Sequence, residues 1–90
     1  MAVTFDPAKR DWTFAARGLD FVDAAGVIEG LSFEFIDDRV DYGEMRMTTV
    51  GMLKGRMVIV VWTERANDYH IISMRKANAR EYARYAGRLG

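Results

Sequence analysis

The stretch "MVIVVWT", residues 57–63, decides the fold, because it is apolar on both faces of an extended chain. A strand that is buried on both sides lies in the interior of a sheet, so we predict a central strand from about 57 to 64. Strand-like runs precede and follow it, at about 45–53 and about 69–75. The turn candidates "KG" at 54–55 and "RAND" at 65–68 separate the three runs, which predicts an antiparallel meander.

The chain before this meander reads as a short strand, two helices and a further strand. The first five residues alternate like a strand, and Asp6 before a proline predicts a capped helix over 7–17. A second short helix is expected after Asp20, its N-cap, and stops at Gly30. The hydrophobic period then changes to two, because "LSFEF" at 31–35 alternates apolar and polar residues, as a strand with one buried face does.

The chain closes with a helix that begins after Asn78, which forms a capping box with Glu81. Apolar residues and arginines follow separate stripes along this helix: Ala79, Tyr82, Ala83 and Ala86 on one, and Arg80, Arg84 and Arg88 on the other. The predicted fold is therefore α+β, a single domain over residues 1–90 in the order β-α-α-β-β-β-β-α. We expect the helices to cover one face of a largely antiparallel sheet.

The composition limits the class of protein. Ninety residues, of which 50% are hydrophobic, suit one small domain with a single core. The chain has no cysteine and one histidine, which argues against disulfides, thiolate chemistry and a His-rich metal cage. The N-terminal residues lack a signal-peptide pattern, and no apolar run approaches the ~18 residues of a membrane span. We therefore expect a cytoplasmic protein that needs neither a membrane nor a cofactor.

The formal charge of zero conceals a strong asymmetry. Residues 1–44 hold four Lys/Arg against ten Asp/Glu, whereas residues 45–90 hold nine against three. Asymmetry of this size is typical of a surface that meets a polyanion or a charged partner. The alternative is that the acidic and basic parts pack against each other and neutralise themselves.

The junction between the last strand and the last helix is the strongest candidate site. The strand ends on Arg75 and Lys76, and the helix begins directly after Asn78. Two cations and the N–H groups of a helix start can together hold a phosphate. The alternative is that Arg75 and Lys76 are ordinary solvated residues at a strand end and bind no phosphate. The arginines Arg80, Arg84 and Arg88 would extend this surface, or would simply form the wet face of the helix.

Four other residues are ambiguous. On the last helix, Tyr82 lies on the apolar stripe and is expected in the core, whereas Tyr85 lies nearer the arginines and could stack on a base or donate a proton. His70 has the pKa for acid-base work, but in a strand it is more often a packed residue. Glu64 lies beside Arg65 at a strand end, and the two would form a surface ion pair. The acidic loop at 37–44 does not match a calcium-binding spacing and reads as a solvated loop or a partner contact.

Several short motifs, in order along the chain, resemble the BrnT-type toxins of bacterial type II toxin-antitoxin systems. They are "FDPAK" at 5–9, "F-x-D-A" at 21–24, "DDRVDYGEMR" at 37–46, "GR" at 55–56, "VVWTER" at 60–65 and "IISMRKA" at 71–77. No single piece is specific, but six in order with nearly the expected spacing make chance a poor explanation. The family also carries "N-x-x-K-H-G", where this chain has "TFAARG", with Thr13 and Arg17 at the Asn and His positions.

The resemblance implies a small ribonuclease of RelE-like fold that cleaves RNA and inhibits translation. It further implies a BrnA-type antitoxin as partner, in a complex of two toxins and two antitoxins that contacts DNA only through the antitoxin. The family's arginines carry over to Arg65 and Arg75, with Lys76 and Tyr85 as helpers. Arg17 replaces the family histidine and can supply only charge. The alternative is a non-catalytic RNA- or protein-binding module that uses the basic half.

The residue types suit metal-independent RNA cleavage. Arginine stabilises the charge that develops on the attacked phosphate, but its pKa above ~12 makes it a poor base. Proton transfer would then depend on Glu64, His70 or Tyr85. A plain hairpin would also separate Arg65 from Arg75 by roughly 23 Å at ~3.3 Å per residue, so that they could not hold one phosphate.

Overall fold

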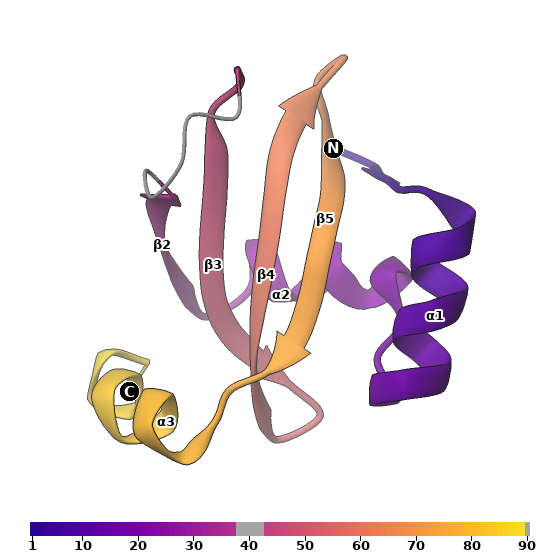
Figure 1. The fold of residues 1–90 in the computed structure, drawn as a ribbon. Coiled ribbons are helices and arrows are strands. Elements are labelled where there is room, and N and C mark those ends of the chain that lie inside the picture. Colours follow the sequence, from indigo (N-terminus) through magenta and orange to yellow (C-terminus); the bar gives the residue numbers. More distant parts are fainter. Residues whose placement is uncertain (38–42, 90) are drawn as a thin grey trace.

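The computed structural model describes residues 1–37 and 43–89, so the central part of the acidic loop, 38–42, lies outside the described residues (Figure 1). The predicted α+β class and element order are confirmed. The elements in chain order are β1 (Val3–Thr4), α1 (Pro7–Arg17), the 3-10 turn η1 (Phe21–Asp23), α2 (Ala24–Glu29), β2 (Ser32–Asp37), β3 (Arg46–Leu53), β4 (Arg56–Arg65), β5 (Asp68–Lys76), α3 (Ala79–Tyr85) and the 3-10 turn η2 (Ala86–Arg88).

The strands form one five-stranded mixed sheet in the order β1-β5-β4-β3-β2. β2, β3, β4 and β5 are antiparallel neighbours, and β1 pairs in parallel with β5 through Val3–Tyr69 and Thr4–His70. The strand β4 lies in the middle, as its two apolar faces predict. The turns on either side of β4 are tight: Lys54 with Gly55, and Ala66 with Asn67, all have positive φ.

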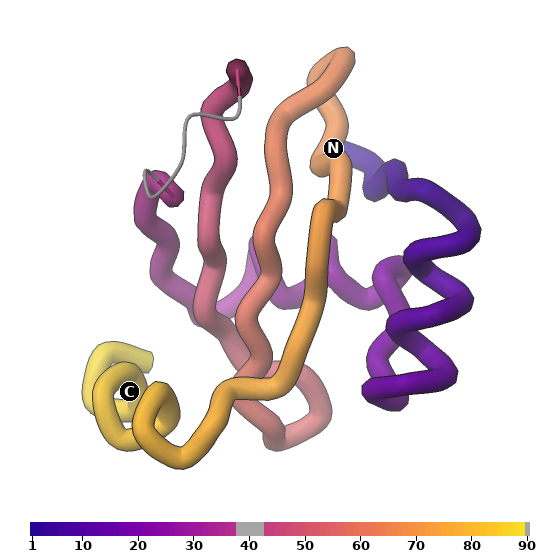
Figure 2. The backbone as a smooth tube through the Cα atoms, in the orientation of Figure 1, coloured from indigo at the N-terminus to yellow at the C-terminus, as the bar shows by residue number. Residues whose placement is uncertain are grey.

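The helices lie on both faces of the sheet, so the expectation that they cover one face is wrong. In Figure 1, α2 passes behind the sheet, whereas α3 and the C-terminal turn lie in front of it; the backbone trace in Figure 2 agrees. The reason is the path of the chain after β5. Ala77 donates its N–H to the Met57 carbonyl, which leads the chain across the end of β4 to the opposite face.

Each face has its own apolar cluster. The larger one packs α2 and η1 on the even-numbered residues of β4, and includes Phe21, Val27, Val58, Val60 and Met74. The smaller one joins Val50, Met57 and Ile59 to Leu89, with Tyr85 and Phe33 packed against it. Because the side chains of a strand alternate between faces, β4 needs consecutive apolar residues over 57–62 to serve both clusters.

The predicted helix ends are confirmed. The Asp6 carboxylate accepts from the Ala8 N–H at the start of α1, and Gly18 ends that helix with a φ of 70°. Asn78 and Glu81 form the predicted capping box of α3. In the part of the chain that the structure describes, none of the helices has the length and apolar character needed to cross a membrane.

Candidate functional site

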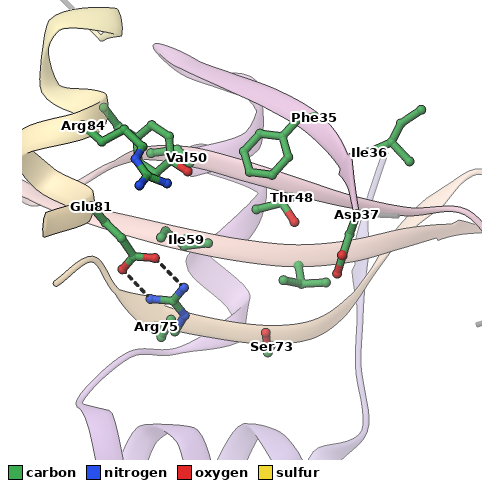
Figure 3. Close-up of a pocket in the computed structure, with 12 residues that line it drawn as sticks. Phe35, Ile36, Asp37, Thr48, Val50, Ile59, Ser73, Arg75, Glu81 and Arg84 are labelled. Atoms are coloured by element: carbon green, nitrogen blue, oxygen red, sulfur yellow. Dashed lines mark hydrogen bonds and ion pairs between the residues drawn. The ribbon is translucent and has the colours of Figure 1, made fainter. Parts of the chain in front are cut away.

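A hollow of about 410 Å³ lies on the face of the sheet that carries α3 (Figure 3). Strands β2 to β5 form its floor, and α3 forms one wall. Its lining combines apolar, hydroxyl and charged side chains: Phe35, Ile36, Asp37, Thr48, Val50, Ile59, Val61, Ser73, Arg75, Glu81, Arg84 and Tyr85.

The strand register explains the floor of the hollow. Val61 of β4 lies between Thr48 of β3 and Ser73 of β5 as its direct cross-strand partners, so two hydroxyls flank an apolar residue. One step along the same face, Ile59 is the partner of Arg75. The guanidinium of Arg75 therefore enters the hollow at the end that α3 closes.

Arg75 is held there by Glu81. Its Nη1 and Nη2 each donate to one carboxylate oxygen of Glu81 at 2.7 Å, and Figure 3 shows Glu81 reaching from α3 to Arg75 on β5. The same carboxylate accepts the Asn78 N–H at 3.0 Å, while the Asn78 side chain accepts the Glu81 N–H at 2.8 Å. The hydrogen bond from Arg75 is the main reason why the pKa of Glu81 falls to about 2.

This geometry changes the predicted junction site. Lys76 pairs with Val58, so its side chain lies on the opposite face from Arg75, and the expected convergence of the two cations is wrong. Two of the N–H groups at the start of α3 are already used within the capping box, because that of Asn78 donates to Glu81 and that of Glu81 donates to Asn78. The sequence revealed the capping box but not the ion pair, because only the turn after β5 brings Glu81 over Arg75.

The exposed and packed side chains of α3 differ from those that the predicted stripes gave. Tyr82 is 53% exposed, whereas the ring of Tyr85 packs 5.2 Å from that of Phe33 and lines the hollow. The expected core position of Tyr82 is therefore wrong. Arg84 also lines the hollow, and the guanidinium of Arg88 lies 4.3 Å over the Phe33 ring.

Like Arg88, the other two candidate RNA-binding arginines do not belong to the hollow's lining. Arg80 is exposed on α3. Arg17 donates from Nη1 to the Met74 carbonyl at 2.9 Å and lies over the Trp12 ring at 5.0 Å. Because β1 pairs with β5 only at Tyr69 and His70, Arg17 satisfies an edge carbonyl that lies beyond that pairing.

Arg65 lies at the far end of the same face. It is six residues from Ile59 along β4, or about 20 Å at ~3.3 Å per residue, so it stands well apart from Arg75 as expected. Its side chain is 52% exposed and pairs with Glu44 at 3.2 Å rather than with Glu64. Glu64 lies on the opposite face, where it lines a separate hollow with Glu34 and Glu44.

His70 lies beside Arg65 and away from the hollow's lining. It is the partner of Thr63 on this face, and its Nδ1 is hydrogen-bonded to the Thr4 hydroxyl at 2.9 Å. Burial, followed by the nearby charge of Arg65, lowers its pKa. Of the described residues that share the lining with Arg75, the titratable ones besides arginine are instead Glu81, Tyr85 and Asp37.

The hollow offers permanent positive charge, hydroxyl groups and a carboxylate over an apolar floor. Arg75 and Arg84 carry donors in the geometry that phosphate oxygens prefer. Phe35 and Tyr85 add aromatic surface on which an unstacked base could rest. The arrangement is therefore suited to a phosphodiester with its neighbouring nucleotides.

A family model and a solved structure point to the same family for this chain. A family model described as "Ribonuclease toxin, BrnT, of type II toxin-antitoxin system" matches residues 5–81. Among solved structures, the chain is similar to the ribonuclease toxin BrnT of Brucella abortus, with 26% identity and a TM-score of 0.69. That likeness covers 87% of this chain and 97% of the other. No curated protein matches.

Proposed function

This chain belongs to the BrnT family of ribonuclease toxins of type II toxin-antitoxin systems, and we propose that it cuts RNA strands internally at the hollow beside α3. The resemblance drawn from six ordered motifs is thereby confirmed. The observation that supports this location is the placement of Arg75 and Arg84 in one hollow with Thr48, Ser73 and Tyr85. Positive charge, hydrogen-bond donors and an aromatic ring are what a nucleotide step requires.

The reaction we propose needs no metal. The 2′-hydroxyl attacks the adjacent phosphate, the bond to the 5′-oxygen breaks, and the products carry a 2′,3′-cyclic phosphate and a 5′-hydroxyl. Arg75 and Arg84 stabilise the charge that grows on the phosphate oxygens. Tyr85 is our candidate for returning a proton to the 5′-oxygen, because its phenol belongs to the same lining.

The other predicted residues take supporting roles in this proposal. Arg65, at the far end of the face, contacts a more distant phosphate, and Arg88 and Arg80 extend the positive surface along the C-terminal helix. Glu64, Lys76 and Arg17 project away from the hollow or are bound elsewhere, which favours structural or partner contacts for them.

The family implies an antitoxin as partner. We propose that it is of the BrnA type, that it forms a complex of two toxins with two antitoxins, and that DNA is contacted only through it. Inhibition of translation by RNA cleavage places the action of the toxin in the cytoplasm.

The test compares two single-arginine variants. Arg75→Ala removes the guanidinium from the hollow, whereas Arg56→Ala removes an exposed arginine at the first position of β4. Expressed without the antitoxin, the wild type and Arg56→Ala should arrest growth, and Arg75→Ala should not. The purified proteins should show the same pattern on an oligoribonucleotide in the presence of EDTA, with products ending in a 2′,3′-cyclic phosphate.

The alternative, a non-catalytic binding module, makes the opposite prediction. It would leave RNA intact in every variant, while the wild type still bound it. Intact RNA with a folded wild-type protein would therefore exclude the cleavage proposal.

A further inference from the structure

Glu81 is paired with the guanidinium of Arg75, which the proposed reaction uses. Its two carboxylate oxygens accept from Nη1 and Nη2 of Arg75 at 2.7 Å each, within the lining of the hollow. A phosphodiester offers an arginine fork the same kind of paired oxygen acceptors. An RNA phosphate that binds this fork therefore takes the place of Glu81 on it.

The capping box keeps Glu81 in the hollow during such an exchange. Glu81 is the third residue of α3, and its Oε1 also accepts the Asn78 N–H at 3.0 Å. Asn78 in turn accepts the Glu81 N–H at 2.8 Å. These contacts belong to the start of α3 alone, so they do not depend on Arg75. The displaced carboxylate would remain next to the phosphate that replaced it.

We propose that Glu81 holds Arg75 in position as a stand-in for phosphate and, after RNA displaces it, accepts the proton of the attacking 2′-hydroxyl. The inference rests on the proposed function and names the proton acceptor of that reaction. The 2′-oxygen forms its bond to phosphorus as its proton passes to the carboxylate. The bond to the 5′-oxygen breaks, and that oxygen takes a proton from the Tyr85 hydroxyl, which solvent later restores.

The same exchange makes Glu81 a better base when RNA is bound. The bond from Arg75 is the largest cause of the low pKa of Glu81, so its loss raises that pKa toward the ordinary value. Among the described residues, the charged or titratable groups that share the hollow with Glu81 are Arg75, Arg84, Asp37 and Tyr85. Of these, Asp37 is the other carboxylate that could titrate in acid.

Glu81→Gln separates the proposed roles from a structural one. Glutamine also serves in a capping box, so α3 keeps its start, but the side chain has neither the charge to hold Arg75 nor a site for a proton. Glu34→Gln is the matched control, because it makes the same change in a carboxylate that lines a separate hollow on the opposite side of the sheet. Each variant would be measured for cleavage of an oligoribonucleotide between about pH 4 and pH 9, and for binding of the same sequence with 2′-deoxy nucleotides, which cannot be cut.

Removal of the Glu81 carboxylate should affect RNA binding and RNA cleavage in opposite directions, because the same group competes for Arg75 and serves as the base. We expect Glu81→Gln to bind the uncut oligonucleotide more tightly than wild type and yet to cleave roughly a hundredfold or more slowly, without the acidic limb of the pH profile. Glu34→Gln should bind and cleave like the wild type.

Three results would overturn the inference while leaving the proposed function intact. They are wild-type cleavage by Glu81→Gln, weakened binding together with slower cleavage in that variant, and loss of the acidic limb in Asp37→Asn but not in Glu81→Gln. A wild-type protein that cuts no RNA would instead reject the proposed function, and the inference with it.

Discussion

At the scale of single residues, the face to which a strand residue points matters more than its position in the chain. Arg75 and Lys76 are neighbours, yet the register places one beside Ile59 in the hollow and the other beside Val58 on the opposite face. The same holds for Glu64 and Arg65. Consecutive charged residues at a strand end therefore lie on two opposite faces of the sheet rather than on one.

The Arg75–Glu81 pair predicts a change of stability in acid. The folded-state pKa of Glu81, about 2, lies below the ordinary value of 4.5. The pair therefore stabilises the fold above about pH 4.5, and its contribution is lost as the pH falls toward 2. The Arg75 side chain is 43% exposed, so solvent screening leaves a contribution of about 1 kcal/mol.

Urea unfolding at pH 7, 4.5 and 2.5 would measure this contribution as a difference between proteins. Between pH 4.5 and 2.5, the wild type should lose about 1 kcal/mol more of its free energy of unfolding than Glu81→Gln does. Equal losses in the two proteins would show that the ion pair does not stabilise the fold.

At the scale of elements, local signals located the helices and strands. Asp6, Gly18 and the Asn78–Glu81 pair mark helix ends by hydrogen bonds made within a few residues, and the structure confirms each one. The packing stripe of α3 was not predictable in the same way. None of the residues that the structure describes in this seven-residue helix is buried, and its orientation follows from the η2 turn and Leu89 packing on β4.

The contact of α2 with β3 depends on a glycine. A Cβ added at Gly51 would lie 2.9 Å from Cγ1 of Val27 and 3.1 Å from Cβ of Ser32. Val27 is buried and stiff at its first side-chain torsion, so it cannot move aside at low cost. We expect Gly51→Ala to lower the free energy of unfolding by about 1–3 kcal/mol, measured by urea denaturation.

Gly26 provides the matched control for this change. It lies within α2 and would place a Cβ in open space. Gly26→Ala should raise the free energy of unfolding by about 0.4–1 kcal/mol, because alanine favours the helix. If the two substitutions had the same effect, the close approach of α2 to β3 would not limit residue size at position 51.

At the scale of the whole molecule, three arginines on one face of the sheet contrast with three glutamates that line hollows on the other side. The face with the hollow carries Arg75, Arg84 and, at its far end, Arg65. Glu29, Glu34 and Glu64 instead line hollows bounded by Trp62 on the opposite side. We assign the face with the hollow to RNA, because Arg75 and Arg84 there can pair with phosphates, next to the carboxylates of Asp37 and Glu81.

The distance between Arg65 and Arg75 predicts a dependence on RNA length. Arg65→Ala should weaken binding of an uncleavable single strand of about ten nucleotides and leave the binding of a dinucleotide unchanged. The slope of the logarithm of the binding constant against that of salt concentration should also fall by about 0.7 for the longer strand. Titrations at several salt concentrations would measure both effects.

Arg56→Ala is the control for the effects of RNA length and salt concentration on binding. It removes the same charge at the first position of β4 and should leave both the affinity and the salt slope as in wild type. A loss of dinucleotide binding in Arg65→Ala would place Arg65 at the hollow itself, against the register of the hairpin.

The sequence by itself determined the α+β class, the order of the elements, the central place of β4 and the family, because these follow from local periodicity, caps, turns and ordered motifs. Only the tertiary structure decided that α3 crosses to the second face, that Tyr85 rather than Tyr82 packs, and that Glu81 holds Arg75. These depend on strand register and on the path of the chain after β5. Such features arise from contacts between distant residues, which no local pattern of side chains specifies.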